Sequence, residues 1–442
     1  MKNLLVVAYY FPPSGGPGVQ RVLKLIKYIR EFGWNPIILT VKDAQYQAID
    51  YSLLEEVPQD CIIYKTKIFE PYDIYRLLTG KAKDQPIDVN NIKKENQKRK
   101  LSEKVAEFIR ATLFIPDARI AWYFSAKSTL KQIFKEQKID AVYSSSPPYT
   151  CSLIAKYVKK KYHIPWIAGF RDPWTDFLTT PKRWFLPKYI DKKLEKSVFQ
   201  SADLVECAWE GIIKDALKKY ADLQSTKFVH NPNGFDSADY PEFNETRNER
   251  FTLTYTGSMY GRRNPDSLFK AIEKLVDENK IEQNQFTLQF IGRFGSEIHE
   301  MFENTKLKEN IKKINYLPHS ESLKKLVQSD ALLLIVDEAK ESEEIVPGKV
   351  YEYLGTKKPL LVIAPEKGAV ADLIYETGAG LVAHQTQIAK IADNFLTLFN
   401  LWKINKKLSG INEEKINKYE RRESAKYLSN LLNNLTKKHL KS

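Results

Sequence analysis

Short apolar runs and amphipathic stretches alternate along nearly the whole chain. The apolar runs have the length of buried strands, and the stretches between them place apolar residues at helical spacing. In the first half we predict strands at residues 4–9, 36–41, 141–144, 165–170 and 203–208, and helices at residues 19–32, 125–138, 151–162, 184–201 and 210–219. Strands that alternate with helices in this way form a parallel sheet with helices on both faces.

The same alternation restarts after residues 237–250, which are charged, contain proline and lack periodicity. We interpret this segment as a domain boundary. The chain is therefore expected to be α/β, with an N-terminal domain at residues 1–240 and a second domain at residues 251–400. Residues 401–442 are expected to form a basic helical tail that packs back on the N-terminal domain. Residues 66–112 are polar and lysine-rich, and we predict that they form an insertion.

The composition agrees with this division and limits the class of protein. A chain of 442 residues exceeds what one hydrophobic core usually supports. The three cysteines are widely spaced and have no metal-like pairing, which favours a reducing cytoplasm. Residues 4–11 lack a small-residue cleavage site and are predicted to be a first strand rather than a signal peptide. No apolar run approaches the length that spans a bilayer.

The charge is strongly positive and uneven. The formal net charge is +14, and from residue 401 onward eleven Lys and Arg stand against four Asp and Glu. Such a field is typical of proteins with polyanionic neighbours, namely nucleic acid, anionic lipid or phosphate-bearing substrates. The alternative is that these exposed lysines only keep the protein soluble. Because the basic residues lack interleaved aromatic side chains, a nucleic-acid partner is not expected.

The most informative stretch is residues 343–359, which connects a predicted strand to a helix at the carboxyl edge of the second sheet. Gly348 permits a close backbone approach, and the helix is predicted to begin near Lys349. Free N–H groups at that start, with Lys349 beside them, favour a phosphate. Glu344 and Glu352 are placed so that both carboxylates can face the same cleft. The alternative is an acidic loop that leads into an ordinary amphipathic helix.

Two further glycine-containing loops are predicted at sheet edges. Gly257 precedes Arg262 and Arg263 after the first strand of the second domain, and paired cations suit a diphosphate. Gly16 lies in a glycine-rich loop between the first strand and the first helix, where a ligand can approach the backbone. Glu352 is suited to accept hydrogen bonds from ribose hydroxyls. No Asp-x-Asp motif or His/Cys cluster is present, so we predict no bound metal.

Polar residues also follow the predicted strands of the first domain. Arg171 and Asp172 come directly after a buried strand, as ligand-facing residues do, although they can instead pair with each other. The aromatic segment at residues 115–124 contains Asp117, Arg119 and Trp122. It either holds an acceptor or covers the sheet edge.

These motifs resemble the retaining group-1 (family-4-like) glycosyltransferases. The resemblance covers nearly the whole chain and is strongest at residues 251–380. It rests on the Glu-x7-Glu spacing, on Thr256-Gly257-Ser258 with the arginines behind it, on Pro232-Asn233-Gly234-Phe235-Asp236 and on residues 347–359. Phe170-Arg171-Asp172-Pro173-Trp174 and the Gly15/Gly16 loop look like a subgroup that builds bacterial surface polysaccharides. The resemblance implies two facing Rossmann-like domains, termed the GT-B fold.

The resemblance also implies an activity and roles for individual residues. The reaction is a transfer with retention from a nucleotide-diphosphate sugar, without a metal or other cofactor, and the acceptor binds in the first domain. Catalytic roles fall to Arg263 (or Arg262) and Lys349 on the diphosphate, to Glu344 near the donor sugar, and to Asp172. The implied donor-binding set is Glu352, Arg262, Gly257, Gly348, Gly16 and Val350, and the acceptor-side candidates are Arg171, Asp117, Arg119 and Trp122.

Two departures from the family pattern leave alternatives open. Many relatives have Gly-Phe-Gly after the first glutamate, whereas this chain has Ile345-Val346-Pro347-Gly348. Glu343 is therefore an alternative to Glu344. A first-domain histidine near the donor is also common in the family. Here Asp172 or Arg171 is the candidate for that place.

The predicted function is therefore glycosyl transfer to a saccharide or lipid-linked acceptor in cell-surface polysaccharide or glycolipid synthesis. The expected location is cytoplasmic, with peripheral contact to the anionic inner face of the membrane. Two other functions stay open. One is nucleotide-sugar epimerisation on the same fold, and the other is a non-enzymatic polyanion-binding protein. The sugar, the base, the acceptor and the linkage do not follow from the sequence.

Overall fold

A computed structural model gives the structure of the chain. It describes every residue except 43, 45, 47, 48, 69–107, 110, 178–179, 243–246, 337–345 and 440–442. Glu343, Glu344 and most of the predicted insertion at residues 66–112 therefore lie outside the described residues. No helix of the described part is both long and apolar enough to cross a membrane.

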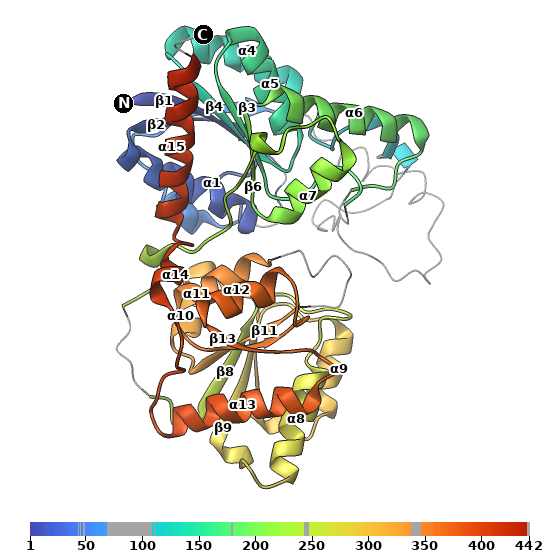
Figure 1. The fold of residues 1–442 in the computed structure, drawn as a ribbon, viewed down its shortest axis with the longest axis vertical. Helices are drawn as coiled ribbons and strands as arrows, with labels where there is room; N and C mark the ends of the chain where they lie inside the picture. Colours follow the sequence, from blue (N-terminus) through green and yellow to red (C-terminus); the bar gives the residue numbers. More distant parts are fainter. Residues whose placement is uncertain are drawn as a thin grey trace. The chain divides into compact units, whose positions relative to one another are not determined.

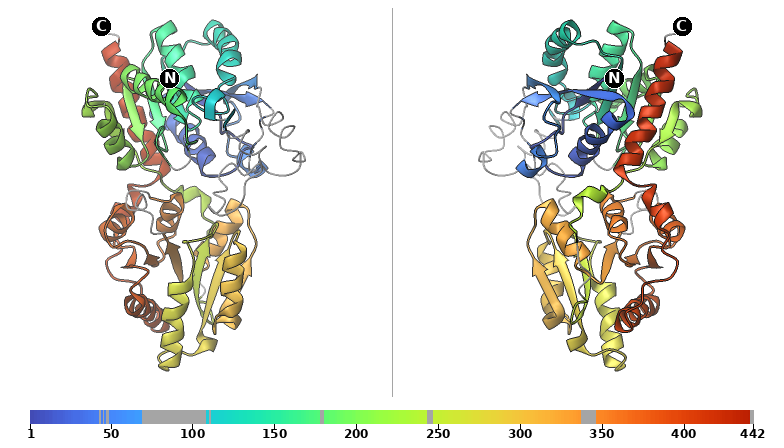
Figure 2. Two further views of the ribbon diagram at one scale, coloured as in Figure 1. Left: turned by 90° about the vertical axis from the view of Figure 1, so that its right-hand side faces the viewer. Right: turned by 90° about the vertical axis from the view of Figure 1, so that its left-hand side faces the viewer.

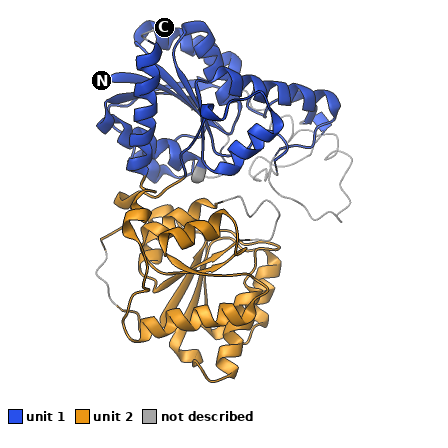
Figure 3. Cartoon of the chain, viewed as in Figure 1, with its two compact units in different colours: residues 1–232, 421–442 blue, residues 233–420 orange. Residues whose placement is uncertain are grey.

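The chain forms two compact units, which Figure 3 shows in blue and orange. Unit 1 comprises Met1–Pro232 together with Arg421–Ser442, and unit 2 is Asn233–Glu420. The division comes before the aperiodic segment at residues 237–250, because the chain after Pro232 is already bound to unit 2. There the Phe235 N–H donates to the Tyr419 carbonyl at 3.0 Å. Of the predicted tail, residues 401–420 belong to unit 2, and the last helix belongs to unit 1.

Unit 1 is built on a seven-stranded sheet in which all neighbouring strands are parallel. The strand order is β3-β2-β1-β4-β5-β6-β7. The strands are β1 (Lys2–Ala8), β2 (Trp34–Lys42), β3 (Ile62–Lys67), β4 (Ala141–Ser146), β5 (Trp166–Phe170), β6 (Leu204–Cys207) and β7 (Phe228–His230). The helices are α1 (Pro17–Tyr28), α4 (Trp122–Glu136), α5 (Thr150–Tyr162), α6 (Phe185–Ser201), α7 (Glu210–Lys219) and α15 (Arg421–His439).

Side chains alternate between the two faces of the sheet, so each face has its own core. Leu4 and Val6 of β1 pack on the side of α1 and α15, and Leu5 and Val7 pack on the side of α4 and α5. Figures 1 and 2 show α15 lying along α1. The basic last helix is thus held by an apolar face.

A buried network of polar side chains stabilises the end of Met1–Pro232, the first of the two segments that form unit 1. Arg21 of α1 pairs with Glu206 of β6 at 2.9 Å, and both side chains are almost fully buried. Arg21 also donates to the Asn231 carbonyl at 2.7 Å, and the Tyr143 hydroxyl donates to Glu206 at 2.7 Å. Burying these charges is tolerable only because they are paired and hydrogen-bonded. The network fixes the chain in unit 1 immediately before it enters unit 2.

Unit 2 repeats the architecture with a six-stranded parallel sheet in the order β10-β9-β8-β11-β12-β13. Its strands are β8 (Phe251–Thr256), β9 (Phe286–Ile291), β10 (Ile311–Ile314), β11 (Ala331–Ile335), β12 (Leu360–Ile363) and β13 (Gly380–Ala383). Helices α8 (Asp266–Asp277), α9 (Ser296–Asn304) and α13 (Ile388–Lys403) contribute to the core on one face. Helices α10 (His319–Val327), α11 (Gly348–Gly355), α12 (Ala369–Thr377) and α14 (Glu413–Asn417) contribute to the core on the other.

The predicted class, two Rossmann-like α/β domains with helices at the C-terminus, is confirmed. Two elements were predicted wrongly. Residues 62–67 form the edge strand β3, although residues 66–112 were assigned to an insertion and no strand was expected here. Helix α4 begins at Trp122, so the end of the supposed aromatic loop is helical. The side chains of β3 are only partly apolar, and the aromatic run at the start of α4 does not by itself distinguish a helix from a loop, so packing against neighbouring elements decides the structure in both places.

Candidate active site

The candidate site of unit 2 lies where the strand order changes direction. The chain proceeds from β8 outward to β9 and β10, and then returns to β11 on the other side of β8. In open parallel sheets the loops at such a switch point separate and leave room for a ligand at the carboxyl edge. The loop after β8 carries Gly257, Arg262 and Arg263, and the connection after β11 leads to α11. Both loops that the sequence singled out therefore meet at this position.

Lys349 lies at the start of α11 and reaches back to the end of β8. Its Nζ donates to the Thr256 carbonyl at 2.8 Å and to the Tyr255 hydroxyl at 3.0 Å. It also lies 4.1 Å from the centre of the Tyr255 ring, a cation–π contact. Burial and the nearby Arg263 charge together lower the pKa of Lys349 to about 7, and Glu352 opposes the shift. An incoming anion would favour the protonated amine.

The backbone at Gly257 leaves space for this lysine. Gly257 has a φ of +115°, and a Cβ added there would lie 2.9 Å from the Lys349 Nζ. The neighbouring Gly292, with a φ of +146°, passes so close that an added Cβ would lie 2.1 Å from the Gly257 carbonyl oxygen. Only glycine is free of both the steric conflict and the backbone strain at these positions. The glycines therefore let the loop after β8 approach the lysine closely.

The two arginines of the loop differ in burial. Arg262 is exposed, whereas Arg263 is half-buried, and the Arg263 Nε is shielded from water without a hydrogen-bond partner. Burial raises the pKa of Tyr255 to about 12, and the nearby Arg263 charge opposes this shift. A buried donor without an acceptor is unfavourable unless a ligand supplies one. Arg263 is thus better placed than Arg262 to hold an anion beside Lys349.

Glu352 is positioned through both its side chain and its backbone. Its Oε1 lies 3.2 Å from the Nε2 of His319, the first residue of α10. Its carbonyl accepts a hydrogen bond from the Tyr240 hydroxyl at 2.7 Å. The side chain stays half-exposed, so its carboxylate is available to hydroxyl groups. Sequence reasoning identified Glu352 but missed His319 and Tyr240, because both come from distant segments.

The other predicted donor residues of unit 2, Gly348 and Val350, offer only their backbone to a ligand. Gly348 is the first residue of α11, and an added Cβ there would meet nothing within 4 Å. The Val350 side chain is fully buried in the core, so only its backbone can face a ligand. Tyr255, which was also missed, is buried near the end of β8, one residue before the strand ends at Thr256. Its position at the carboxyl end of a strand is the signal that could have identified it.

The switch point of unit 1 lies between β1 and β4, and Arg171 follows the adjacent β5. Arg171 donates to the carbonyls of Gly18 (2.5 Å) and Pro147. Its guanidinium lies 5.6 Å from the centre of the Tyr10 ring. Arg171 thus joins the loops after β1, β4 and β5. Gly16 is the exposed residue before α1, with a φ of +94° and open space where a Cβ would stand.

The two aspartates of unit 1 have different surroundings. Asp117 accepts from the Thr150 N–H at 3.0 Å and the Thr150 hydroxyl at 2.8 Å, and it also accepts from the Arg119 N–H at 2.9 Å. It therefore stabilises the start of α5 and the turn that contains it. Burial raises the pKa of Asp172, and Arg171 opposes the shift. This direction favours a carboxyl that can hold a proton nearer neutral pH.

The last two acceptor-side candidates, Arg119 and Trp122, both contact buried groups of unit 1. The Arg119 guanidinium lies over the Tyr9 ring at 5.1 Å. Trp122 is completely buried in the core of unit 1, and its indole N–H donates to the Thr66 hydroxyl at 2.6 Å. Trp122 therefore fixes α4 on β3 and does not present its ring to a ligand. This position disagrees with Trp122 as an acceptor-side residue and agrees with the alternative that the segment covers the sheet edge.

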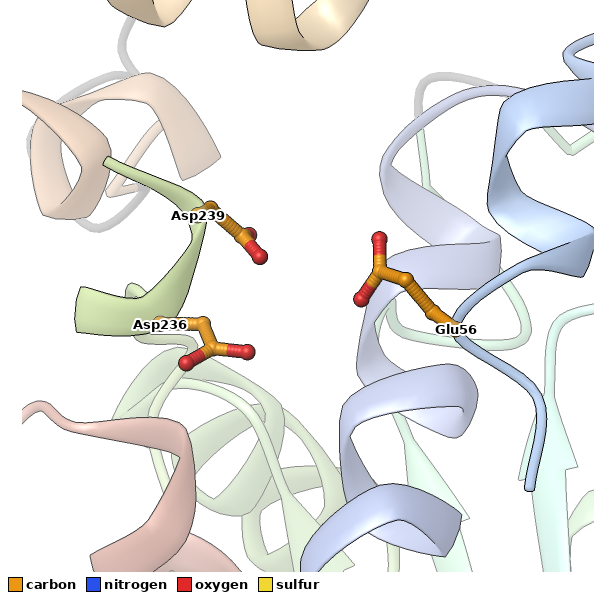
Figure 4. Close-up of side chains that lie close together, drawn as sticks. All are labelled: Glu56, Asp236 and Asp239. Atoms are coloured by element: carbon orange, nitrogen blue, oxygen red, sulfur yellow. The ribbon is translucent and has the colours of Figure 1, made fainter. Parts of the chain in front are cut away.

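Figure 4 shows three carboxylates, Glu56, Asp236 and Asp239. Glu56 belongs to unit 1 and accepts a hydrogen bond from the buried Lys24 of α1. Asp236 precedes a short 3-10 helix at the start of unit 2 and accepts from the Ala238 N–H at 3.1 Å. Among the residues that the structure describes, neither unit by itself contains three close His, Cys, Asp or Glu ligand atoms.

Known structures with the same arrangement of elements define the fold of the chain. Staphylococcus aureus TarM, solved with fondaparinux, alpha-GlcNAc-glycerol and UDP, has a TM-score of 0.59 at 13% identity, over 98% of this chain and 100% of that one. WaaG, a glycosyltransferase of lipopolysaccharide biosynthesis, has a TM-score of 0.52 at 13% identity, with coverage of 99% and 98%. A putative UDP-N-acetylglucosamine 2-epimerase from Listeria monocytogenes has a TM-score of 0.53 at 12% identity, over 97% of this chain and 95% of that one. At such identities the likeness establishes the GT-B fold alone.

The class of enzyme follows from a family match in unit 2. Residues 236–415 match the family model described as glycosyl transferases group 1. A comparison with curated protein sequences gives no match. The chain therefore carries a group 1 glycosyltransferase domain on a GT-B fold, and it is a glycosyltransferase. The matched residues include Arg263, Lys349 and Glu352.

Proposed function

We propose that the chain transfers a sugar, with retention of anomeric configuration, from a nucleotide-diphosphate sugar to a saccharide or lipid-linked acceptor. The observation that carries this proposal is the cationic cluster of unit 2. Lys349 and Arg263 lie close together at the start of α11, beside a glycine loop and with one buried arginine N–H that lacks an acceptor. A linked pair of phosphates would supply acceptors for both cations and for the helix N-terminus.

The same cluster accounts for the chemistry of donor cleavage. When the bond between sugar and diphosphate breaks, negative charge develops on the leaving group and positive charge on the sugar. Lys349 and Arg263 would stabilise the diphosphate as that charge develops. Since arginine and lysine can supply the positive charge that a divalent metal would supply, we propose a metal-independent reaction. Sugar transfer that persists in excess EDTA would support this proposal. Transfer that is lost in EDTA and restored by a divalent metal would contradict it.

Glu352 completes the donor site by binding the ribose. Its carboxylate is fixed by His319 and stays half-exposed on the same edge of the sheet. We further propose that Glu344, or its neighbour Glu343, approaches the donor sugar, and that Asp172 acts on the acceptor side. We place the reaction in cell-surface polysaccharide or glycolipid synthesis, at the cytoplasmic face of the membrane. TarM and WaaG support this context by their described ligands and pathway, and the basic charge supports contact with anionic lipid.

The test has two stages. A thermal-shift screen with UDP, GDP, ADP and dTDP should identify one nucleotide that raises the melting temperature, because a ligand stabilises the state that binds it. Arg263→Gln and Glu352→Gln should each weaken that shift. Arg247→Gln is the matched control, because Arg247 packs over the Trp402 ring in the same unit. If both site variants bound nucleotide as the native chain does, the assignment would be wrong.

The epimerase alternative requires a separate measurement. One structurally similar chain has that putative function, so the fold alone does not decide between the reactions. Incubation of the nucleotide sugar without any acceptor distinguishes them. An epimerase converts the sugar under these conditions, whereas a transferase needs an acceptor to release nucleotide at its full rate.

A further inference from the structure

Exposed apolar side chains gather at the beginning of α6 and on the segment at residues 111–116, which Arg183 joins to it. The exposed fractions are 80% for Phe185, 67% for Leu113, 57% for Tyr189, 47% for Leu186, 46% for Trp184 and 39% for Ile190. We call these six residues the α6 surface. Single exposed apolar residues are ordinary, but a group on one helix end is typical of an interaction site. Figure 1 shows α6 along the outside of unit 1.

The α6 surface rests on a buried ion pair. Arg183 pairs with Asp191 at 2.8 Å, and both side chains are almost inaccessible to solvent. Burial raises the pKa of Asp191 to about 6, and Arg183 opposes this shift. The indole N–H of Trp174 donates to the second carboxylate oxygen of Asp191 at 2.8 Å. Such a pair is stable only when its hydrogen bonds are satisfied.

Arg183 also joins the α6 start to the preceding segment that carries Leu113. Its guanidinium donates to the carbonyls of Ala111 (2.6 Å), Phe114 (3.0 Å) and Pro116 (2.8 Å). The Trp184 indole N–H donates to the Thr112 hydroxyl at 3.0 Å. Two segments that are distant in sequence are thus held together by one arginine through backbone carbonyls. The segments that carry the α6 surface are therefore held in place by hydrogen bonds of the fold.

The charge around the α6 surface is positive. Lys188 and Lys192 both pair with Asp176, at 3.2 and 2.8 Å, so one carboxylate offsets two ammonium groups. Lys193 lies 6.0 Å from the centre of the Tyr189 ring, and Lys182 directly precedes Arg183. Aromatic and aliphatic side chains bordered by lysines are typical of proteins that lie on anionic bilayers, where the rings enter the interface and the lysines contact headgroups.

We propose that the α6 surface docks the chain on an anionic lipid bilayer. The inference rests on the proposed function in that a lipid-linked acceptor requires the enzyme at a membrane. The basic last helix is a less suitable anchor, because Ala425, Leu428 and Leu432 of α15 are buried against α1. The α6 surface combines the apolar side chains with the charge, and it thereby brings unit 1 to the membrane where the acceptor resides.

The test is co-sedimentation of the full chain with vesicles. One set contains phosphatidylcholine alone, and the other contains equal parts of phosphatidylcholine and phosphatidylglycerol. The native chain should bind the anionic vesicles far better. The double variant Phe185→Ser/Leu186→Ser should lower the partition coefficient by about tenfold or more, since it removes two side chains that enter the interface. Lys182→Gln/Lys193→Gln should lower it several-fold, and added salt should reduce this difference.

Tyr375→Ser is the matched control, because Tyr375 lies on α12 of unit 2 and is 55% exposed. It should bind vesicles as the native chain does. The inference is overturned if the native chain does not bind anionic vesicles. It is also overturned if the Phe185→Ser/Leu186→Ser variant sediments with these vesicles as the native chain does. A native dimer that this variant converts to a monomer, without vesicle binding by either, would assign the surface to a second copy instead.

A nucleotide thermal shift measured on the same proteins separates this inference from the proposed function. The α6 variants should keep the full shift, because Lys349, Arg263 and Glu352 lie in unit 2 and no residue of the α6 surface belongs to the donor-binding set. If the shift is present and vesicle binding is absent, only the docking surface fails. If vesicle binding is present and no nucleotide produces a shift, the donor assignment fails instead.

Discussion

The two sheet edges of this chain differ in how completely the protein itself satisfies their charged residues. In unit 1, Arg171 is bound to the carbonyls of Gly18 and Pro147, and Asp117 is bound to the start of α5. In unit 2, Arg263 keeps a buried N–H without an acceptor, and Lys349 has a lowered pKa. The first arrangement stabilises loops, and the second is unfavourable until an anion arrives. A charged residue after a buried strand can therefore serve either structure or binding, and its partners decide which.

The largest effect that we expect comes from Lys349→Met. Nucleotide affinity should fall by about 100-fold, the order of effect seen when one partner of a buried charged contact is removed. The free energy of unfolding should nevertheless rise, because the variant removes an amine whose charge is disfavoured by burial. Calorimetric titration and urea unfolding measure the two quantities. A variant that loses stability and keeps its affinity would contradict the contrast between the two units.

The same residue predicts a pH dependence. The pKa of Lys349 is about 7 in the folded chain, below the value of about 10.4 in an unfolded chain. The unfolded state then binds more protons between these values, so stability should rise with pH from about 7 toward 10. Urea unfolding at pH 7 and pH 9 should show this rise in the native chain and a smaller one in Lys349→Met. Equal slopes in both proteins would oppose a desolvated lysine.

Gly257→Ala should impair the donor loop without removing any charge. Its φ of +115° strains an L residue by about 1–3 kcal/mol, and the new methyl group would displace the Lys349 amine. Melting temperature and nucleotide affinity should both fall. Gly261→Ala is the matched control, since Gly261 also has a positive φ (+59°) but open space for a Cβ. If both variants lost affinity equally, backbone strain alone would explain the effect.

Arg171→Gln should change stability and leave donor binding intact. The variant removes the charged hydrogen bonds to the Gly18 and Pro147 carbonyls, and a loss of about 2–3 kcal/mol is expected. Urea unfolding and nucleotide titration measure the two outcomes. If the variant kept native stability and donor binding but no longer bound the acceptor, Arg171 would instead be assigned to the acceptor site.

His319→Ala should have the smallest effect. We expect the KM for the nucleotide sugar to rise about fivefold with little change in kcat, because His319 orients Glu352 through one hydrogen bond. His319→Gln should restore part of the loss, since an amide can also donate to the carboxylate. A fall in kcat alone would assign His319 a role in the chemical step.

The alternation of apolar runs was sufficient to predict both sheets, because parallel strands are buried on both faces and carry a strong signal. The edge strand β3 was missed because its residues are only half-buried and include two lysines. Gly257, Arg263 and Lys349 could be brought together from sequence, because loops after neighbouring parallel strands meet at one edge. His319 and Tyr240 could not be placed, since their contacts with Glu352 depend on how distant segments pack.

The first unit shows where such reasoning reaches its limit. The sequence left open whether the segment with Trp122 holds an acceptor or covers the sheet edge, and the indole is in fact buried and bonded to Thr66. Asp117 and Arg171 have the residue types of a binding site, but the sequence does not show that nearby N–H groups and carbonyls already engage them. Partners of polar side chains in irregular loops depend on the fold around them. The roles of Asp172 and Glu344 stay predictions.

The most direct test of the donor site is proton uptake on nucleotide binding. Calorimetric titration at pH 8, with the nucleotide that stabilises the chain, is repeated in two buffers of different ionisation enthalpy. At this pH the phosphates are already ionised, whereas Lys349 is mostly neutral. We predict that the native chain takes up close to one proton and that Lys349→Met takes up almost none. Equal proton uptake by both proteins would contradict the assignment of Lys349 to the diphosphate.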